Sequence, residues 1–240
     1  MYHDVVEGSS DIYAVTPDDF RRQLDEIQRS TGRPPAAFDN LADGDWMITF
    51  DDGGASALFA AEELQRRSWR GHFFVATDLV GTPAHLDWDG VRAVAAMGHL
   101  IGSHSCSHPD RMADLSAQEL LDEWSRSGAV LARELGGPVR TASVPGGLYS
   151  KTVGRTAAEA GYKTLFTSLP RQGLRSIDGS RLIGRYAIRR DTTPAEAAAA
   201  AAGKAVPWAR QRAAWGLRGA VKKVAGSRYE SMRRTLLARR

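Results

Sequence analysis

Residues 46–54 read Trp-Met-Ile-Thr-Phe-Asp-Asp-Gly-Gly, an apolar run that ends in two carboxylates and two glycines. The run predicts a short buried strand over 47–50 that delivers Asp51 and Asp52 at its carboxyl end. The glycines permit a sharp turn into a helix predicted over 57–67. Parallel α/β sheets are built from such units and carry their functional groups at the carboxyl ends of the strands.

Strand-like apolar runs alternate with helical patterns along the rest of the chain. Further strands are expected over 72–76, 99–103, 139–144, 163–167 and 182–189, and further helices over 88–97, 116–135 and 152–160. Ser116 and Glu119 have the spacing of a capping box, and Thr16 or Asp18 begins a helix before the first strand. This alternation predicts an α/β fold with a parallel sheet.

The chain of 240 residues is long enough for one full domain with an extension. We expect a main domain over residues 1–195 and an Ala-rich, then basic, helical extension over 196–240. Residues 204–240 hold eleven Lys or Arg and one acidic residue, and because the whole chain carries +4, the first 203 residues carry −6. The basic character therefore belongs to the extension.

Composition also bears on the compartment. Cys106 is the single cysteine, which excludes an internal disulfide and gives no sign of an oxidising environment. Met1 is followed directly by Tyr-His-Asp-Val, without the basic and apolar regions of a signal peptide, and the sequence has no membrane-spanning run. We therefore expect the protein in the cytoplasm.

Two histidines, His104 and His108, follow the strand expected over 99–103. Together with Asp52 they form a set of one carboxylate and two imidazoles, which leaves a metal position open for water, as in catalytic zinc sites. The set predicts one divalent ion, with Zn²⁺ preferred and Co²⁺ or Ni²⁺ as substitutes. A pair of loop histidines that only hydrogen-bond is the alternative. The pattern favours a metal-dependent hydrolase.

Two motifs at this spacing resemble those of a known family. Residues 49–53, Thr-Phe-Asp-Asp-Gly, resemble the first motif of the polysaccharide deacetylases (carbohydrate esterase family 4), and residues 104–109, His-Ser-Cys-Ser-His-Pro, resemble the second. The opening residues 1–5 are similar to the start of many bacterial members. The resemblance covers about residues 1–195. It implies a distorted (β/α) barrel with fewer than eight strands, here followed by the basic extension.

The resemblance assigns roles to the motif residues. It implies that Asp51 is the general base and that Asp52, His104 and His108 hold the metal, which makes residues 1–195 a catalytic domain. A carboxylate that only orients a ligand histidine is the alternative for Asp51. Cys106 is expected to be a spacer that faces away from the metal.

Residues 143–147, Ser-Val-Pro-Gly-Gly, resemble the third motif of the family. The resemblance implies that Pro145 lines the substrate site and that the backbone N–H of Gly146 stabilises the oxyanion. The family usually has an arginine, which holds the base aspartate, where Ser143 stands, and an aromatic residue where Gly146 stands. An ordinary Pro-Gly turn is the alternative.

The late Leu-x-His of the family, which usually supplies the general acid, has no counterpart here. All six histidines lie at or before residue 108, and residues 182–189 read Leu-Ile-Gly-Arg-Tyr-Ala-Ile-Arg. We expect Arg185 or Arg189 to bind an anionic group of the substrate, and Asp51 to return its proton to the leaving amine. An exposed arginine at a strand end is the alternative. His3 and His72 are expected to be core or rim residues.

The extension has an amphipathic pattern from Ala214 onward, with Trp208 and Trp215 near its start. The apolar arc contains Leu217, Val221, Val224, Met232 and Leu236, and basic residues occupy the opposite arc. This pattern favours the surface of an anionic bilayer, here the inner membrane face. Packing on the domain or a partner is the alternative, and no nucleic-acid motif supports binding of nucleic acid.

The sequence therefore predicts a metal-dependent deacetylase that acts on an N-acetylated sugar. From the expected location we infer a glycan precursor in envelope or exopolysaccharide synthesis as the substrate. Two alternatives stay open. One is deformylation or another non-peptide amide hydrolysis on the same scaffold, and the other is a non-catalytic carbohydrate-binding descendant.

Overall fold

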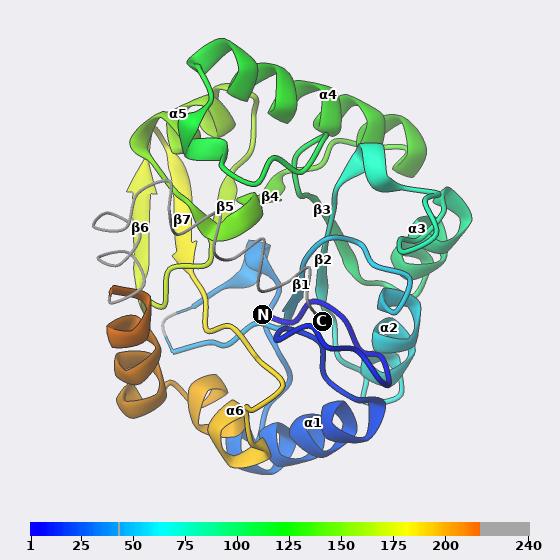
Figure 1. Ribbon diagram of the computed structural model, residues 1–240, viewed down its shortest axis with the longest axis vertical. Helices are drawn as coiled ribbons and strands as arrows, with labels where there is room; N and C mark the ends of the chain where they lie inside the picture. Colours follow the sequence, from blue (N-terminus) through cyan, green and yellow to red (C-terminus); the bar gives the residue numbers. More distant parts are fainter. Residues whose placement is uncertain (43, 217–240) are drawn as a thin grey trace.

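Seven short strands form one curled, half-barrel sheet in the computed structural model, which describes residues 1–42 and 44–216. Along the sheet they are β1 (Thr49–Phe50), β2 (His72–Val75), β3 (Leu100–Ser103), β4 (Thr141–Ser143), β5 (Thr164–Thr167), β7 (Ser180–Gly184) and β6 (Leu174–Ile177). All neighbours are parallel except β6 and β7. Figure 1 shows the helices arranged around the outside of this sheet. The expected α/β fold with a parallel sheet is confirmed.

Six labelled α-helices precede, separate or follow the strands, and a further helical stretch lies at residues 205–216. They are α1 (Pro17–Thr31), α2 (Ala57–Gln65), α3 (Trp88–Ala96), α4 (Ala117–Leu135), α5 (Lys151–Glu159) and α6 (Pro194–Ala201). The cap predicted for α4 is present, because the Ser116 hydroxyl accepts from the Glu119 N–H and the Glu119 carboxylate accepts from the Ser116 N–H. Four 3₁₀ turns complete the described elements: η1 (Phe38–Asn40), η2 (Thr77–Leu79), η3 (Met112–Asp114) and η4 (Pro145–Gly147).

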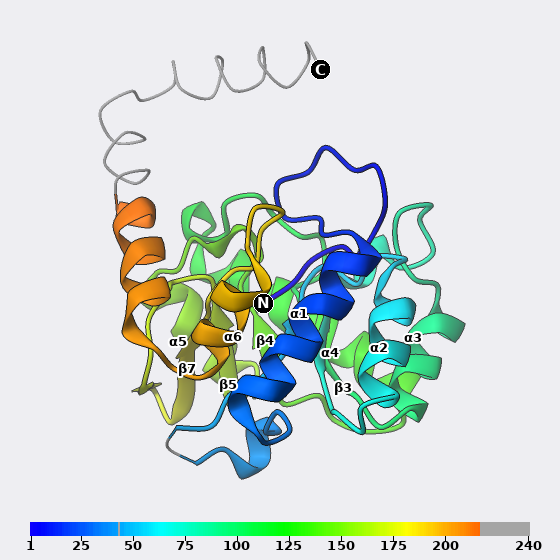
Figure 2. The same cartoon turned by 90° about the horizontal axis from the view of Figure 1, so that it is seen from below.

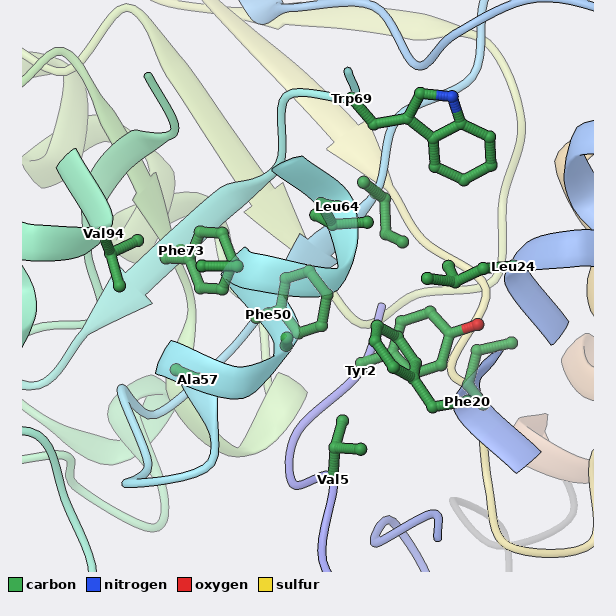
Figure 3. Packing of buried hydrophobic residues seen from close by; sticks show 14 of the residues in the cluster. Tyr2, Val5, Phe20, Leu24, Phe50, Ala57, Leu64, Trp69, Phe73 and Val94 are labelled. Carbon is green, nitrogen blue, oxygen red and sulfur yellow. The ribbon is translucent and has the colours of Figure 1, made fainter. Parts of the chain in front are cut away.

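The opening segment of the chain lies beside β1 as a short strand-like stretch. The Tyr2 N–H donates to the Thr49 carbonyl at 2.8 Å, and the Asp51 N–H donates to the Tyr2 carbonyl at 3.0 Å. The Tyr2 ring is buried and packs on Phe20 and Phe50 in the core between the sheet and α1 (Figure 3). Because side chains alternate along an extended segment, the next residue, His3, faces the opposite side.

The last strand begins and ends earlier than expected. It was predicted over 182–189, but β7 covers Ser180–Gly184 and pairs with β6, a strand that the sequence analysis did not predict. Asp178 and Gly179 join the two strands with φ values of 46° and 82°. This is the Asp-Gly turn that matches the twist of a tight hairpin.

The Ala-rich segment packs on the main domain. Helix α6 lies against α1, and its Ala197 and Ala198 are buried in the same hydrophobic core as Phe20 and Leu24 (Figure 2). A second helical stretch follows over residues 205–216. The amphipathic arcs predicted from Leu217 onward lie outside the described residues, and the boundary at 195 stays a prediction. No described helix is long and apolar enough to span a bilayer.

Candidate metal centre and catalytic site

The three predicted metal ligands converge beyond the carboxyl ends of β1 and β3. Asp52 follows β1, His104 directly follows β3, and His108 lies in the loop after it. The Asp52 Oδ1 atom is 3.1 Å from His104 Nε2 and 3.2 Å from His108 Nε2. One ligand atom from each residue lies within 4.8 Å of the other two. The carboxylate and both imidazole nitrogens therefore face one small volume.

Backbone strain is concentrated in the loops that carry these ligands. Asp52, Ser105 and His108 have φ values of 73°, 64° and 55°, in the left-handed region that side chains other than glycine rarely adopt. Such residues cost about 1–3 kcal/mol each and persist where the surroundings fix them. Glu123 of α4 does this for the histidine loop, because its Oε2 accepts from the N–H groups of Cys106 and Ser107 at 2.9 Å.

The donor set fits a divalent cation. Two ligand atoms bound at about 2.0–2.1 Å to one tetrahedral zinc ion lie about 3.3 Å apart, close to the separations seen here. His104 Nδ1 bonds to the Ser143 carbonyl oxygen at 3.0 Å, so its Nε2 is the nitrogen directed at the site. Burial raises the pKa of Asp52, but hydrogen bonds from His104 and His108 outweigh it, and the pKa lies well below its usual range. The ionised Asp52 carboxylate therefore favours a cation between it and the two imidazoles.

Cys106, between the two histidines, is not part of this set. Its thiol is buried, donates to Asp78 Oδ1 at 3.1 Å, and accepts from the Thr77 hydroxyl at 3.4 Å. Burial raises the pKa of this thiol. The spacer role expected for Cys106 agrees with this geometry.

Asp51 is clamped by an arginine from the far side of the sheet. Arg185, directly after β7, donates from Nη1 to Asp51 Oδ1 at 2.6 Å and from Nη2 to Asp51 Oδ2 at 2.7 Å. The guanidinium lies over the rings of Phe74 and Phe166, 5.6 and 5.8 Å from their centroids. Burial raises the pKa of Asp51, but the charges of Arg185 and His104 outweigh it and lower the pKa below its usual value. Asp51 is therefore ionised and fixed in place. Its Oδ2 atom lies 3.9 Å from His104 Nε2.

The role expected for Arg185 needs correction. A guanidinium has five N–H donors, and here each has an acceptor: the two Asp51 oxygens, Thr49 Oγ1, the Ser143 hydroxyl and the Thr167 carbonyl. No donor is left for an anionic group of a substrate, and the side chain is 5% exposed. Arg185 instead supplies the charge that the third motif lacks at Ser143, and the Ser143 hydroxyl lies between Arg185 and Asp51.

Arg189 is separate from this network. Its Nε lies 3.6 Å from Asp191 Oδ1, and its backbone N–H donates to the Thr192 hydroxyl. Among the described residues, no contact joins its side chain to the metal ligands or to Asp51. Its expected substrate-binding role stays a prediction.

The third-motif loop forms η4, with Pro145 buried and Gly146 exposed at its tip. Gly146 has a φ of 62°, and a Cβ atom placed there would lie 2.6 Å from the Asp110 carbonyl oxygen. A side chain is therefore excluded by backbone, which explains why no aromatic residue stands here. Within the part of the chain that the structure describes, the Gly146 N–H donates to no protein acceptor, so it is available to a ligand.

His3 is the residue that sequence reasoning missed. Burial lowers its pKa, while the charges of Asp51 and Asp52 act in the opposite direction. Its ring packs on Tyr13 with centroids 4.8 Å apart, and its buried Nδ1 has no hydrogen-bond partner. The pairing of residues 1–5 with β1, which places His3 near the site, is seen only in the structure.

The chain matches the family model described as polysaccharide deacetylase over residues 39–165. This match spans more than half of the chain, and the chain belongs to the polysaccharide deacetylase family. The range includes both metal-site loops and the third-motif loop. The resemblance inferred from the two motifs is therefore confirmed.

Solved structures of deacetylases share this fold. IcaB from Ammonifex degensii has a TM-score of 0.70 and 24% identity, over 82% of this chain and 93% of its own. A polysaccharide deacetylase from Bacillus cereus has a TM-score of 0.73 and 21% identity, over 84% of this chain and 67% of its own. At these identities the likeness shows the fold alone.

A relative from Geobacillus stearothermophilus, an uncharacterized 30.6 kDa protein, is 29% identical over 126 residues. The match covers 51% of this chain and 45% of that protein, so the chain spans less than half the length of this relative. The activity, substrates and partners of the whole protein are therefore matters for proposal.

Proposed function

We propose that this protein is a metal-dependent deacetylase that removes the acetyl group from an N-acetylated sugar. One observation carries the proposal: an ionised carboxylate, Asp51, is held rigidly next to a His₂Asp set with metal-ligand geometry. Family membership supports deacetylation of N-acetylated sugars as the reaction class. Metal dependence and the particular sugar are the parts that need experiment.

Asp52, His104 and His108 would hold the metal. When bound, a divalent cation such as Zn²⁺ polarises the amide carbonyl and lowers the pKa of water. Asp51 takes the proton of the attacking water, and Arg185 keeps its two oxygens in one orientation during that step. The Gly146 N–H donates to the carbonyl oxygen as it becomes an oxyanion.

The second half of the reaction needs a proton on the sugar nitrogen. The C–N bond breaks as acetate forms, and the amine accepts the proton that Asp51 removed from water. We assign the transfer to His3, whose buried Nδ1 atom has no hydrogen-bond partner and whose pKa is lowered by burial and raised by the charges of Asp51 and Asp52. Other imidazoles outside the metal set already have partners: His72 accepts from the Phe38 N–H, His99 bonds to Gly71 and Ala61, and His85 bonds to Thr82.

The wider setting is part of the same proposal. A glycan precursor in envelope or exopolysaccharide synthesis is the substrate that we propose, with action in the cytoplasm at the inner membrane face. The excess of basic residues over 204–240 supports attraction to anionic lipid. Fractionation of cells that contain either the full chain or a chain without residues 217–240 tests whether the protein lies at the membrane.

Acetate release and metal content test the central proposal together. Purified wild type, Asp51→Asn and Asp52→Ala are each measured for bound metal and for acetate released from N-acetylglucosamine oligomers. We expect about one zinc, cobalt or nickel ion per chain in wild type and Asp51→Asn, loss of metal in Asp52→Ala, and no turnover in either variant. Asp89→Asn, an exposed carboxylate on α3, is the matched control.

Each outcome separates the alternatives. A protein that binds no metal, even after incubation with Zn²⁺, rules out this mechanism and points to a carbohydrate-binding descendant. A metalloprotein that releases formate from N-formyl amides, but no acetate from N-acetyl sugars, is a different amide hydrolase on the same scaffold.

A further inference from the structure

The third-motif loop lacks an aromatic neighbour of its own. Gly146 stands where the family usually has an aromatic side chain, and the Asp110 carbonyl leaves no room for a Cβ atom there. This side of the site therefore needs another element if a sugar ring is to be held against the loop.

The helical stretch 205–216 is firmly attached next to β7 and reaches this loop. The Gln211 side chain accepts from the Ala187 N–H and donates to the Ala187 carbonyl, both at 2.8 Å, as a neighbouring strand would. The Trp208 indole donates to the Ala200 carbonyl at 3.1 Å and packs on Tyr186. In Figure 2 the orange helix stands beside β7, and its last turn lies on the same side as the loop of residues 5–16.

Trp215 emerges from the same face of this helix. It follows Trp208 by seven residues and Gln211 by four, and these spacings place all three on one side of a helix. A Cβ atom built on Gly147 would lie 2.9 Å from Trp215 Cη2 and 2.7 Å from Ser168 Cβ. The indole therefore lies against Gly147, the residue directly after the proposed oxyanion donor, where Ser168 and a φ of 68° also disfavour a side chain.

The exposure of Trp215 suits a ligand contact. The residue is only partly buried, and among the described residues its indole N–H has no acceptor. An indole offers a flat apolar face and one N–H donor, which match the C–H face and the hydroxyl groups of a pyranose ring. Trp208 and Gln211 hold the helix, so the ring position is fixed before a ligand arrives.

We propose that Trp215 is a specificity-determining residue that stacks on a sugar ring next to the one being deacetylated. This inference rests on the proposed function, because it assumes a glycan substrate longer than one sugar. The helical stretch 205–216 thus supplies the aromatic group that the third motif lacks, although the two segments are far apart in the sequence.

Steady-state kinetics of acetate release from the N-acetylglucosamine tetramer test the proposal. We expect Trp215→Ala to raise KM about tenfold with kcat changed less than twofold, and Trp215→Phe to raise KM about twofold. Arg212→Ala, on the exposed side of the same helix, is the control and should match wild type. Thermal unfolding verifies that each variant is folded, and Trp215→Leu replaces Trp215→Ala if the latter is not.

The results distinguish this inference from the proposed function. If wild type releases no acetate from any N-acetylated sugar, the proposed function fails and this inference fails with it. If wild type is active and Trp215→Ala leaves KM unchanged, the inference alone is wrong. A fall in kcat with an unchanged KM also overturns it, because Trp215 would then only hold η4 in place.

Discussion

Histidines lie at both edges of the sheet near β2 and β3: His72 and His99 at the amino ends of the strands, and His104 and His108 after the carboxyl end of β3. At the amino ends, His72 accepts from the Phe38 N–H and His99 bonds to Gly71 and Ala61, so both imidazoles serve the backbone. At the carboxyl end, His104 and His108 both face the Asp52 carboxylate. Burial lowers the pKa of His72 to about 4, whereas the hydrogen bond to Asp52 raises the pKa of His108.

The comparison shows that position along a strand, and not residue type, decides what a histidine does. At the amino ends, the hydrogen bonds of His72 and His99 are to backbone groups. The carboxyl ends open on loops that hold carboxylates in strained conformations. We therefore expect changes at the carboxyl ends to alter turnover, and changes at the amino ends to alter only stability.

The largest effect at the carboxyl end is expected from Arg185→Ala. This change leaves Asp51 buried without a counter-charge, which raises its pKa and frees its orientation, so kcat should fall about 10³-fold. Removal of one partner from a buried ion pair costs about 3–5 kcal/mol, measured as the free energy of unfolding in urea. Arg181→Ala, an exposed arginine on β7, is the matched control.

A second variant makes this result specific. Addition of Ser143→Arg to Arg185→Ala returns a guanidinium to the position that the third motif usually gives it, and we expect part of the lost kcat to return. A rise in KM with unchanged kcat and unchanged stability for Arg185→Ala would instead support substrate binding by this arginine.

A smaller effect is expected from His3→Asn. Loss of a group that transfers a proton to the leaving amine typically lowers kcat about 10²-fold, while the metal ligands are untouched. The measurement is kcat for acetate release together with metal content, with His85→Asn as control because, within residues 1–42 and 44–216, the His85 ring hydrogen-bonds to Thr82 alone. Full activity of His3→Asn would return the proton transfer to Asp51 alone.

The smallest effect is expected at the amino end, from His72. An ordinary histidine has a pKa near 6.5, whereas the pKa of His72 in the folded protein is about 4. The folded state is therefore fully stable with respect to this residue above about pH 6.5. It loses stability as the pH falls toward 4, because the unfolded chain then binds a proton that folded His72 does not. Metal-free wild type should therefore lose about 2 kcal/mol of unfolding free energy between pH 7 and pH 5 from this residue.

His72→Gln is the test of that assignment. Glutamine keeps an acceptor for the Phe38 N–H but does not titrate, so its urea-unfolding free energy should fall less between pH 7 and pH 5. An identical fall in both proteins would mean that other groups carry the acid sensitivity. Any loss of acetate release in His72→Gln would contradict the expectation that changes at the amino ends of the strands alter only stability.

Much of the fold could be predicted from local pattern. The strand–helix alternation gave the parallel sheet, and the Ser116–Glu119 spacing gave the start of α4. The hairpin of β6 and β7 is not predicted, although Asp178-Gly179 is a recognisable turn signal, because the apolar run of the sequence lies after this turn. The exposed residues of β6 carry no such apolar run.

The candidate site, like the fold, could be predicted in part from local sequence. Asp51, Asp52, His104 and His108 lie in two short segments, and the order of parallel strands brings those segments together. Arg185 was assigned to the substrate because its partner Asp51 lies 134 residues away in the sequence. His3 was set aside for the same reason, since nothing local shows that residues 1–5 lie beside β1.

The sequence by itself determined which groups the candidate site contains: two carboxylates and two imidazoles at metal-site spacing, at the ends of strands that the strand–helix alternation predicts to be parallel. Only the tertiary structure decided which charge holds Asp51, which face His3 occupies, and that Trp215 lies against Gly147. Spacing within a strand or loop is fixed by local backbone geometry. Contacts between distant segments depend on how the curled sheet closes and on which residues its packing leaves side by side.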